Sequence, residues 1–120
     1  MSMLNLREKF DVAAKVFMDK GLIASARIGS PALASLFFGK TSYEANAEAL
    51  AIAADKKHYA VTDMMLTTVG NNVFAYNYYF DRGAAWNRFE ETARKDHILE
   101  RQFTAYNWKY EQAYNSLGFL

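Results

Sequence analysis

The stretch from Ala84 to Ser116 contains neither proline nor glycine, and it constrains the fold more than any other feature of the sequence. Two acidic residues within it precede basic residues by four positions, the order that stabilises a helix: Glu90 with Arg94 and Glu91 with Lys95. At about 1.5 Å per residue this helix would be roughly 50 Å long, whereas a compact chain of this size is about 35 Å across. We therefore expect a long C-terminal helix over residues 84–116.

The apolar residues of this helix form two stripes of helical spacing that do not share a phase. The first stripe consists of Trp86, Phe89, Ala93 and His97. The second consists of Leu99, Phe103, Tyr106, Tyr110, Ala113 and Leu117. At about 100° per residue the second is rotated by roughly 120° from the first. The helix either kinks near 95–98 or stays straight and packs its halves against different neighbours, and the absence of glycine and proline favours the straight helix.

The chain is rich in aromatic residues, and thirteen of the nineteen fall between Phe74 and Phe119. Tyrosine and tryptophan combine a large apolar area with a polar group, which suits them to contact surfaces. Trp108 lies well off the second stripe, so the distal half of the helix has apolar surface on two sides. We expect residues 99–120 to project from a single helical domain, 1–120, toward a partner chain. The predicted contact residues are Phe103, Tyr106, Trp108, Tyr110 and Tyr114.

The N-terminal segment also has helical spacing. Asn5 with Glu8 has the pattern of a capping box, and Gly21 is a natural stop. Apolar residues recur between these signals at steps typical of a helix: Leu6, Phe10, Ala13, Ala14 and Phe17. We therefore predict a first helix that ends near Gly21.

Two further helices are predicted before residue 60. Ser30 followed by Pro31 marks the start of a short helix that ends at Gly39. Thr41 with Glu44 repeats the capping-box pattern and opens an alanine-rich helix.

Residues 60–80 fit two structures. Valine, threonine and aromatic runs flank Gly70 and the asparagines after it, which is typical of a β-hairpin. Helical spacing is also present, in Leu66, Val69, Val73, Tyr76 and Phe80, and Asp63 would cap such a helix. We favour the helix. The sequence therefore predicts an all-α protein of four or five helices, with a hairpin over 60–80 as the alternative.

Composition argues against several classes of function. The chain has no cysteine, which rules out disulfide frameworks and thiolate chemistry. Its net charge is +1 with no basic stripe, so we expect no nucleic-acid partner. The charge-poor segments are interrupted by glycine, proline or asparagine, and we expect no membrane span. The N-terminus lacks the apolar run of a signal peptide, which favours the cytoplasm or a particle assembled inside a cell.

Few residues suggest chemistry. His97, with Asp96 and Glu100 beside it, and the pair Asp55 and His58 resemble only part of a metal-binding helical bundle. The Glu-x-x-His motif of such bundles is missing, and no phosphate loop or nucleophile elbow occurs. We therefore expect no metal, no cofactor and no enzymatic activity.

These observations predict a non-enzymatic structural or assembly subunit. It would form a homo-oligomer or dock on a larger complex, by analogy a virion-type particle, through the aromatic C-terminal helix. One alternative is a binder of an apolar small molecule, lined by Met64, Met65 and the aromatic residues. The other is an inhibitor that docks on the surface of an enzyme.

Overall fold

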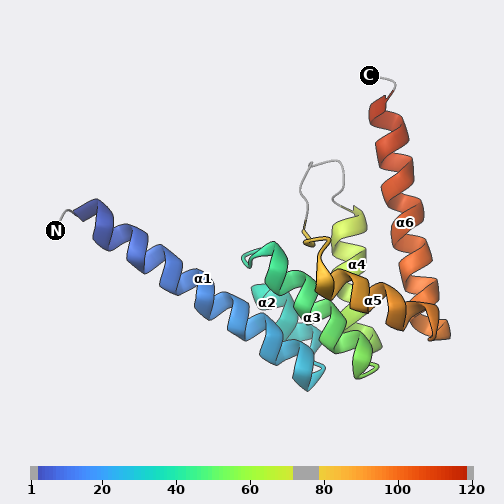
Figure 1. The fold of residues 1–120 in the computed structure, drawn as a ribbon, viewed down its shortest axis with the longest axis horizontal. Coiled ribbons are helices and arrows are strands. Elements are labelled where there is room, and N and C mark those ends of the chain that lie inside the picture. The colour runs from blue at the N-terminus through green and yellow to red at the C-terminus, as the bar shows by residue number, and fades with distance from the viewer. Residues whose placement is uncertain (1–2, 72–78, 119–120) are drawn as a thin grey trace.

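The computed structural model describes residues 3–71 and 79–118, and within these ranges the chain is all-α, as predicted (Figure 1). Six helices follow one another, and no strand occurs in the described ranges: α1 (Met3–Ile28), α2 (Pro31–Phe37), α3 (Tyr43–Asp55), α4 (Tyr59–Asn71), α5 (Ala84–Arg94) and α6 (His97–Gly118). The helix favoured over a hairpin at 60–80 is confirmed as far as Asn71. The predicted positions Val73 and Tyr76 lie outside the described residues.

Helix α3 lies at the centre of the fold and packs against α1, α4 and α5. A helix surrounded in this way must be apolar on nearly every side. Its alanines meet that requirement with little volume, so the neighbouring helices can approach closely. The buried ones are Ala45, Ala47, Ala49, Ala51, Ala53 and Ala54.

Helix α1 continues well past the predicted stop at Gly21 and ends at Ile28. A Cβ atom at Gly21 would fall 2.5 Å from the Phe37 ring, so the glycine allows α2 to lie close to α1. The predicted cap at Asn5 is also wrong, because α1 already begins at Met3. Gly21 therefore marks a close approach of two helices.

The caps of α2 and α3 show how polar side chains set the helix starts. Ser30 accepts a hydrogen bond from the Leu33 amide at 3.1 Å, which confirms the predicted start of α2. Helix α3 is capped by Ser42 and not by the predicted Thr41. Asp19 of α1 accepts hydrogen bonds of 2.8 Å from both the amide and the hydroxyl of Ser42, and so fixes the cap against α1.

Thr41 instead belongs to a buried hydrogen-bond network of three residues. Its hydroxyl donates to the side-chain oxygen of Asn46, which is completely buried. The Asn46 amide nitrogen donates in turn to the Tyr79 carbonyl at 2.7 Å. Buried polar atoms need such partners, and these three residues tie the start of α3 to the segment that precedes α5.

The long helix predicted over 84–116 is divided into α5 and α6, so the preference for a straight helix was wrong. The cause is Asp96. Its Oδ1 accepts hydrogen bonds from the amides of Ile98, at 3.0 Å, and Leu99, at 3.1 Å, which is the geometry of an N-cap. A second carboxylate oxygen accepts from the Tyr59 hydroxyl of α4 at 2.8 Å. A capping aspartate therefore ends one helix and starts the next without glycine or proline.

The division of the helix explains the two stripes of different phase. Trp86 and Phe89 of α5 pack against Phe103 of α6, with ring centroids 5.9 and 5.5 Å apart. Tyr106 lies 6.0 Å from Trp86 by the same measure. The two stripes thus face each other across the corner between the helices.

The molecule is elongated, because two helix ends extend beyond the packed centre (Figure 1). Its principal extents are 52 × 41 × 25 Å, and its radius of gyration is 15.6 Å. A compact chain of this length would have a radius of gyration of about 13.6 Å. The projecting ends are the first half of α1 and the distal half of α6. None of the helices in the described part of the chain is long and apolar enough to cross a membrane.

We expect the stability of the fold to depend on pH through Asp96. The hydrogen bond from the Leu99 amide, followed by the one from the Tyr59 hydroxyl, lowers the pKa of Asp96 below its ordinary value of 3.8. The folded state therefore binds this proton more weakly than the unfolded state does. The stabilisation is complete above the unfolded pKa and is lost as the pH falls through the lowered folded value.

Asp96→Asn keeps a capping side chain but removes the charge that the Leu99 amide and the Tyr59 hydroxyl stabilise, so its melting temperature should be below that of the wild type at neutral pH. The difference should shrink as the pH falls below 4, measured by circular dichroism. Asp63→Asn, at an exposed carboxylate inside α4, is the control. A difference in melting temperature that stays constant as the pH falls below 4 would contradict the pH-dependent stabilisation by Asp96.

Candidate interaction surface

The outward side of α6 carries a tryptophan that the chain itself does not cover. Trp108 is 62% exposed, whereas Tyr106, two positions earlier, is 4% exposed. At about 100° per residue the two side chains point to nearly opposite sides of the helix. The core-facing side of α6 is therefore occupied by Tyr106, and Trp108 lies on the reverse side.

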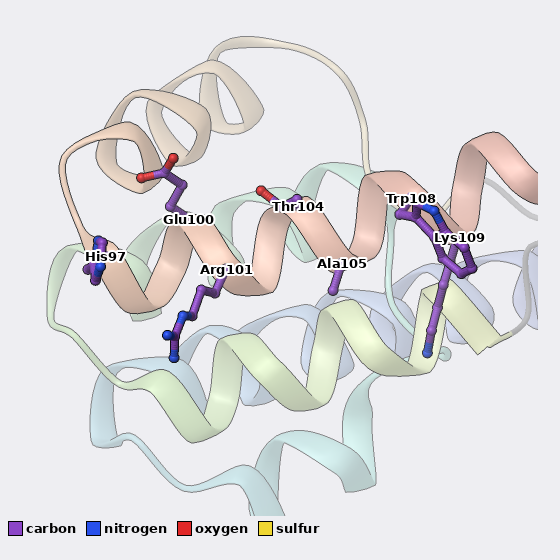
Figure 2. Close-up of a pocket in the computed structure, with 7 residues that line it drawn as sticks. All are labelled: His97, Glu100, Arg101, Thr104, Ala105, Trp108 and Lys109. Carbon is purple, nitrogen blue, oxygen red and sulfur yellow. The ribbon is translucent and has the colours of Figure 1, made fainter.

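Trp108 borders an open hollow of about 560 Å³ on this outward side (Figure 2). All its lining residues come from α6: His97, Glu100, Arg101, Thr104, Ala105, Trp108 and Lys109. Figure 2 shows His97 at one end and Trp108 toward the other, with the small side chains of Thr104 and Ala105 between them. The hollow is thus a shallow seat along one helix, with both acidic and basic groups at its edges.

The five predicted contact residues fall into two groups. Phe103 and Tyr106 pack inside the chain, in an aromatic cluster with Trp86, and Tyr110 is half-buried beside them. Trp108 and Tyr114 are exposed, at 62% and 69%. Tyr114 is rotated by about 120° around the helix from Trp108, so the two do not share one side.

Arg82 contacts three aromatic side chains of the cluster. Its guanidinium lies 4.1 Å from the centre of the Trp86 ring and 5.8 Å from that of Tyr110. It also donates a 3.1 Å hydrogen bond to the Tyr106 hydroxyl. Burial raises the pKa of Tyr106, and the Arg82 charge acts in the opposite direction. The aromatic rings on the inner side of α6 therefore have partners within the chain.

The residues considered for metal binding lie apart from one another. His58 is placed near the Arg27 carbonyl, with its Nε2 at 3.2 Å. Asp55 accepts a hydrogen bond from Thr92 at 2.9 Å and lies 3.7 Å from Arg88. His97 is exposed at the start of α6. Across residues 3–71 and 79–118, no three histidine, aspartate or glutamate side chains gather in a way that could hold a metal ion.

A smaller hollow, of about 300 Å³, lies between α3 and α5, and charged residues line most of it. Arg88, one of its lining residues, pairs with Glu48 at 3.3 Å and with Asp55 at 3.7 Å. Surface ion pairs of this kind contribute little to stability. The arrangement is a solvated contact between two helices, and it shows no feature that points to a ligand.

A second exposed surface, which was not predicted from the sequence, lies on the first half of α1. The stripe that includes Leu6, Phe10 and Phe17 looks like a core-facing side, but these residues are 61%, 74% and 66% exposed. A phase comparison within α1 would have revealed this. The buried Leu22 lies about 160° around the helix from Leu6, so the stripe and the core-facing side are different sides of α1.

Comparison of the chain with protein-family models, with curated proteins and with solved structures gives no match. Inferences about function therefore rest on which side chains are buried and which are exposed.

Tyr106 and Trp108 should respond in opposite ways to replacement by alanine. Tyr106→Ala removes a buried ring from the aromatic cluster and should cost about 3–5 kcal/mol of unfolding free energy. Trp108→Ala should change it by less than about 0.5 kcal/mol, because the side chain is exposed. Urea unfolding at low protein concentration measures both values. A large loss in Trp108→Ala under those conditions would mean that the tryptophan is buried within its own chain.

Proposed function

We propose that this protein is a non-enzymatic assembly subunit that associates with its own kind or docks on a larger complex through the outward side of α6. The observation that carries the proposal is Trp108, exposed on the side of the helix opposite the core. Tryptophan is among the residues that most often dominate the binding energy of an interface. Its indole also keeps an N–H donor for a polar partner.

The surroundings of Trp108 suit a protein partner. Thr104 and Ala105 are small, so a side chain of the partner can rest against the helix beside the indole ring. Glu100 and Lys109 place opposite charges at the edges of this seat. An apolar centre with a polar rim is the usual composition of a protein interface.

The proposal predicts that Trp108→Gln weakens association by roughly tenfold or more, because a central interface tryptophan typically contributes at least that much. Light scattering after size exclusion, over a wide range of concentration, measures the effect. Tyr43→Gln is a matched control, since Tyr43 is 50% exposed and lies on α3. Association that is unchanged by Trp108→Gln would contradict the proposal.

Tryptophan fluorescence gives an independent readout of the same contact. The chain has two tryptophans, and Trp86 is already buried at 2% exposure. Association through α6 should therefore shift the emission of Trp108 to shorter wavelength as the concentration rises. The Trp108→Gln variant should show no such shift.

A further inference from the structure

The first half of α1 is a helix that projects from the packed centre of the molecule (Figure 1). Every residue from Asn5 to Phe17 is exposed, and we call this segment the arm. Its apolar side chains repeat at steps of four, three and four: Leu6, Phe10, Ala13 and Phe17. Val12 and Val16, 64% and 46% exposed, lie about 130° and 90° around the helix from this stripe and are not part of it.

The arm extends the packed half of α1, which supplies the helix nucleus, but each further turn in water is only marginally stable without packing. Helices in proteins gain most of their stability by packing an apolar stripe against another surface. In the arm that stripe faces solvent. The arm therefore needs a partner, and the pattern of its side chains indicates which one.

We propose that the arm pairs antiparallel with the arm of a second copy of this chain. In the register that aligns the two stripes, Phe10 lies opposite Ala13 of the second copy, and Leu6 lies opposite Phe17. The two-fold axis repeats both contacts, as a symmetric dimer requires. The Phe10 ring of each copy thus packs on the small Ala13 side chain of the other. The spacing of the stripe, with steps of four and three residues, is that of paired helices.

At one end of the proposed contact, Phe17 is already packed against α2 of its own chain. Phe17 packs edge-on against Phe37 of α2, with the ring centroids 6.5 Å apart. In the antiparallel register, Leu6 of the second copy meets Phe17 beside this pair. The end of each arm can therefore rest on both helices of its partner.

The charges of the arm favour a protein over a membrane. Arg7, Lys9 and Lys15 are balanced in large part by Glu8 and Asp11. A helix that lies on an anionic membrane surface is typically rich in lysine and arginine on its polar side. A surface of mixed sign is instead compatible with a second copy of itself.

The area of the contact predicts a reversible dimer. Phenylalanine buries about 150–250 Å², and the exposed parts of Leu6, Phe10 and Phe17 of both arms add up to roughly 800 Å². That is the size of a weak, transient contact and below that of a standard specific interface. We therefore expect monomer and dimer to interconvert as the protein is diluted.

The inference rests on the proposed assembly function but uses a different surface from Trp108. Sedimentation equilibrium of the wild type, Phe10→Gln and Trp108→Gln separates the two. Phe10→Gln should weaken the dimer roughly a hundredfold, because the symmetric contact loses two rings. Ile28→Gln is the matched control, since Ile28 is 68% exposed on the same helix but outside the arm. Its dimer should be as strong as that of the wild type.

The outcomes distinguish the two proposals. A wild type that stays monomeric at every concentration overturns the pairing of arms. A dimer that only Trp108→Gln weakens also overturns the pairing of arms, but it supports the α6 surface. A dimer weakened only by Phe10→Gln supports the arms and counts against α6. Association that neither variant weakens overturns both.

The direction of pairing can be tested separately by disulfide cross-linking of introduced cysteines, because the chain contains no cysteine of its own. Leu6→Cys and Phe17→Cys chains are mixed and oxidised. Antiparallel arms should link unlike chains, whereas links mainly between like chains would overturn the proposed register. The same measurement decides the case in which Phe10→Gln and Trp108→Gln both weaken association. Disulfide links between unlike chains would then support the antiparallel pairing of arms. Their absence would overturn that pairing and mean that the arm contacts a different surface.

Discussion

The carboxylate of Asp96 sets the angle between α5 and α6, and much of the structure depends on that angle. It satisfies two amides at the start of α6 and accepts a hydrogen bond from Tyr59 of α4. The corner brings the aromatic side of α5 against the inner side of α6. It also directs the reverse side of α6, with Trp108, toward solvent. One capping residue therefore determines which aromatic residues become core and which remain exposed.

Small residues determine how the other helices pack. The alanines of α3 are buried on almost all sides, and Gly21 lets the Phe37 ring lie directly on α1. Close packing of this kind gives a dense centre with little volume. The large buried side chains, among them Trp86, Phe89 and Tyr106, gather around α5 and the first half of α6. Aromatic and aliphatic residues on the projecting halves of α1 and α6 lie outside this packed centre.

The sequence was sufficient for the fold class and for the start of α2, because helical spacing and the Ser30-Pro31 pair are local signals. It was insufficient for the corner at Asp96, where a capping aspartate inside a good helical pattern has no local signature. The phase difference between the stripes was the correct clue, and the absence of glycine and proline outweighed it wrongly. The buried position of Tyr106 depends on Arg82 and Phe80, which spacing along one helix cannot reveal.

Both projecting helices carry apolar residues on two different sides. In α6 the core-facing side and Trp108 lie on opposite sides, and in α1 Leu22 and the arm stripe are separated by a similar rotation. A single domain of this size buries only part of the surface that its unfolded chain exposes. A helix with two apolar sides can satisfy one of them within such a domain. Helices α1 and α6 each present a second apolar side to solvent, and the two proposed contacts would cover these sides with another chain.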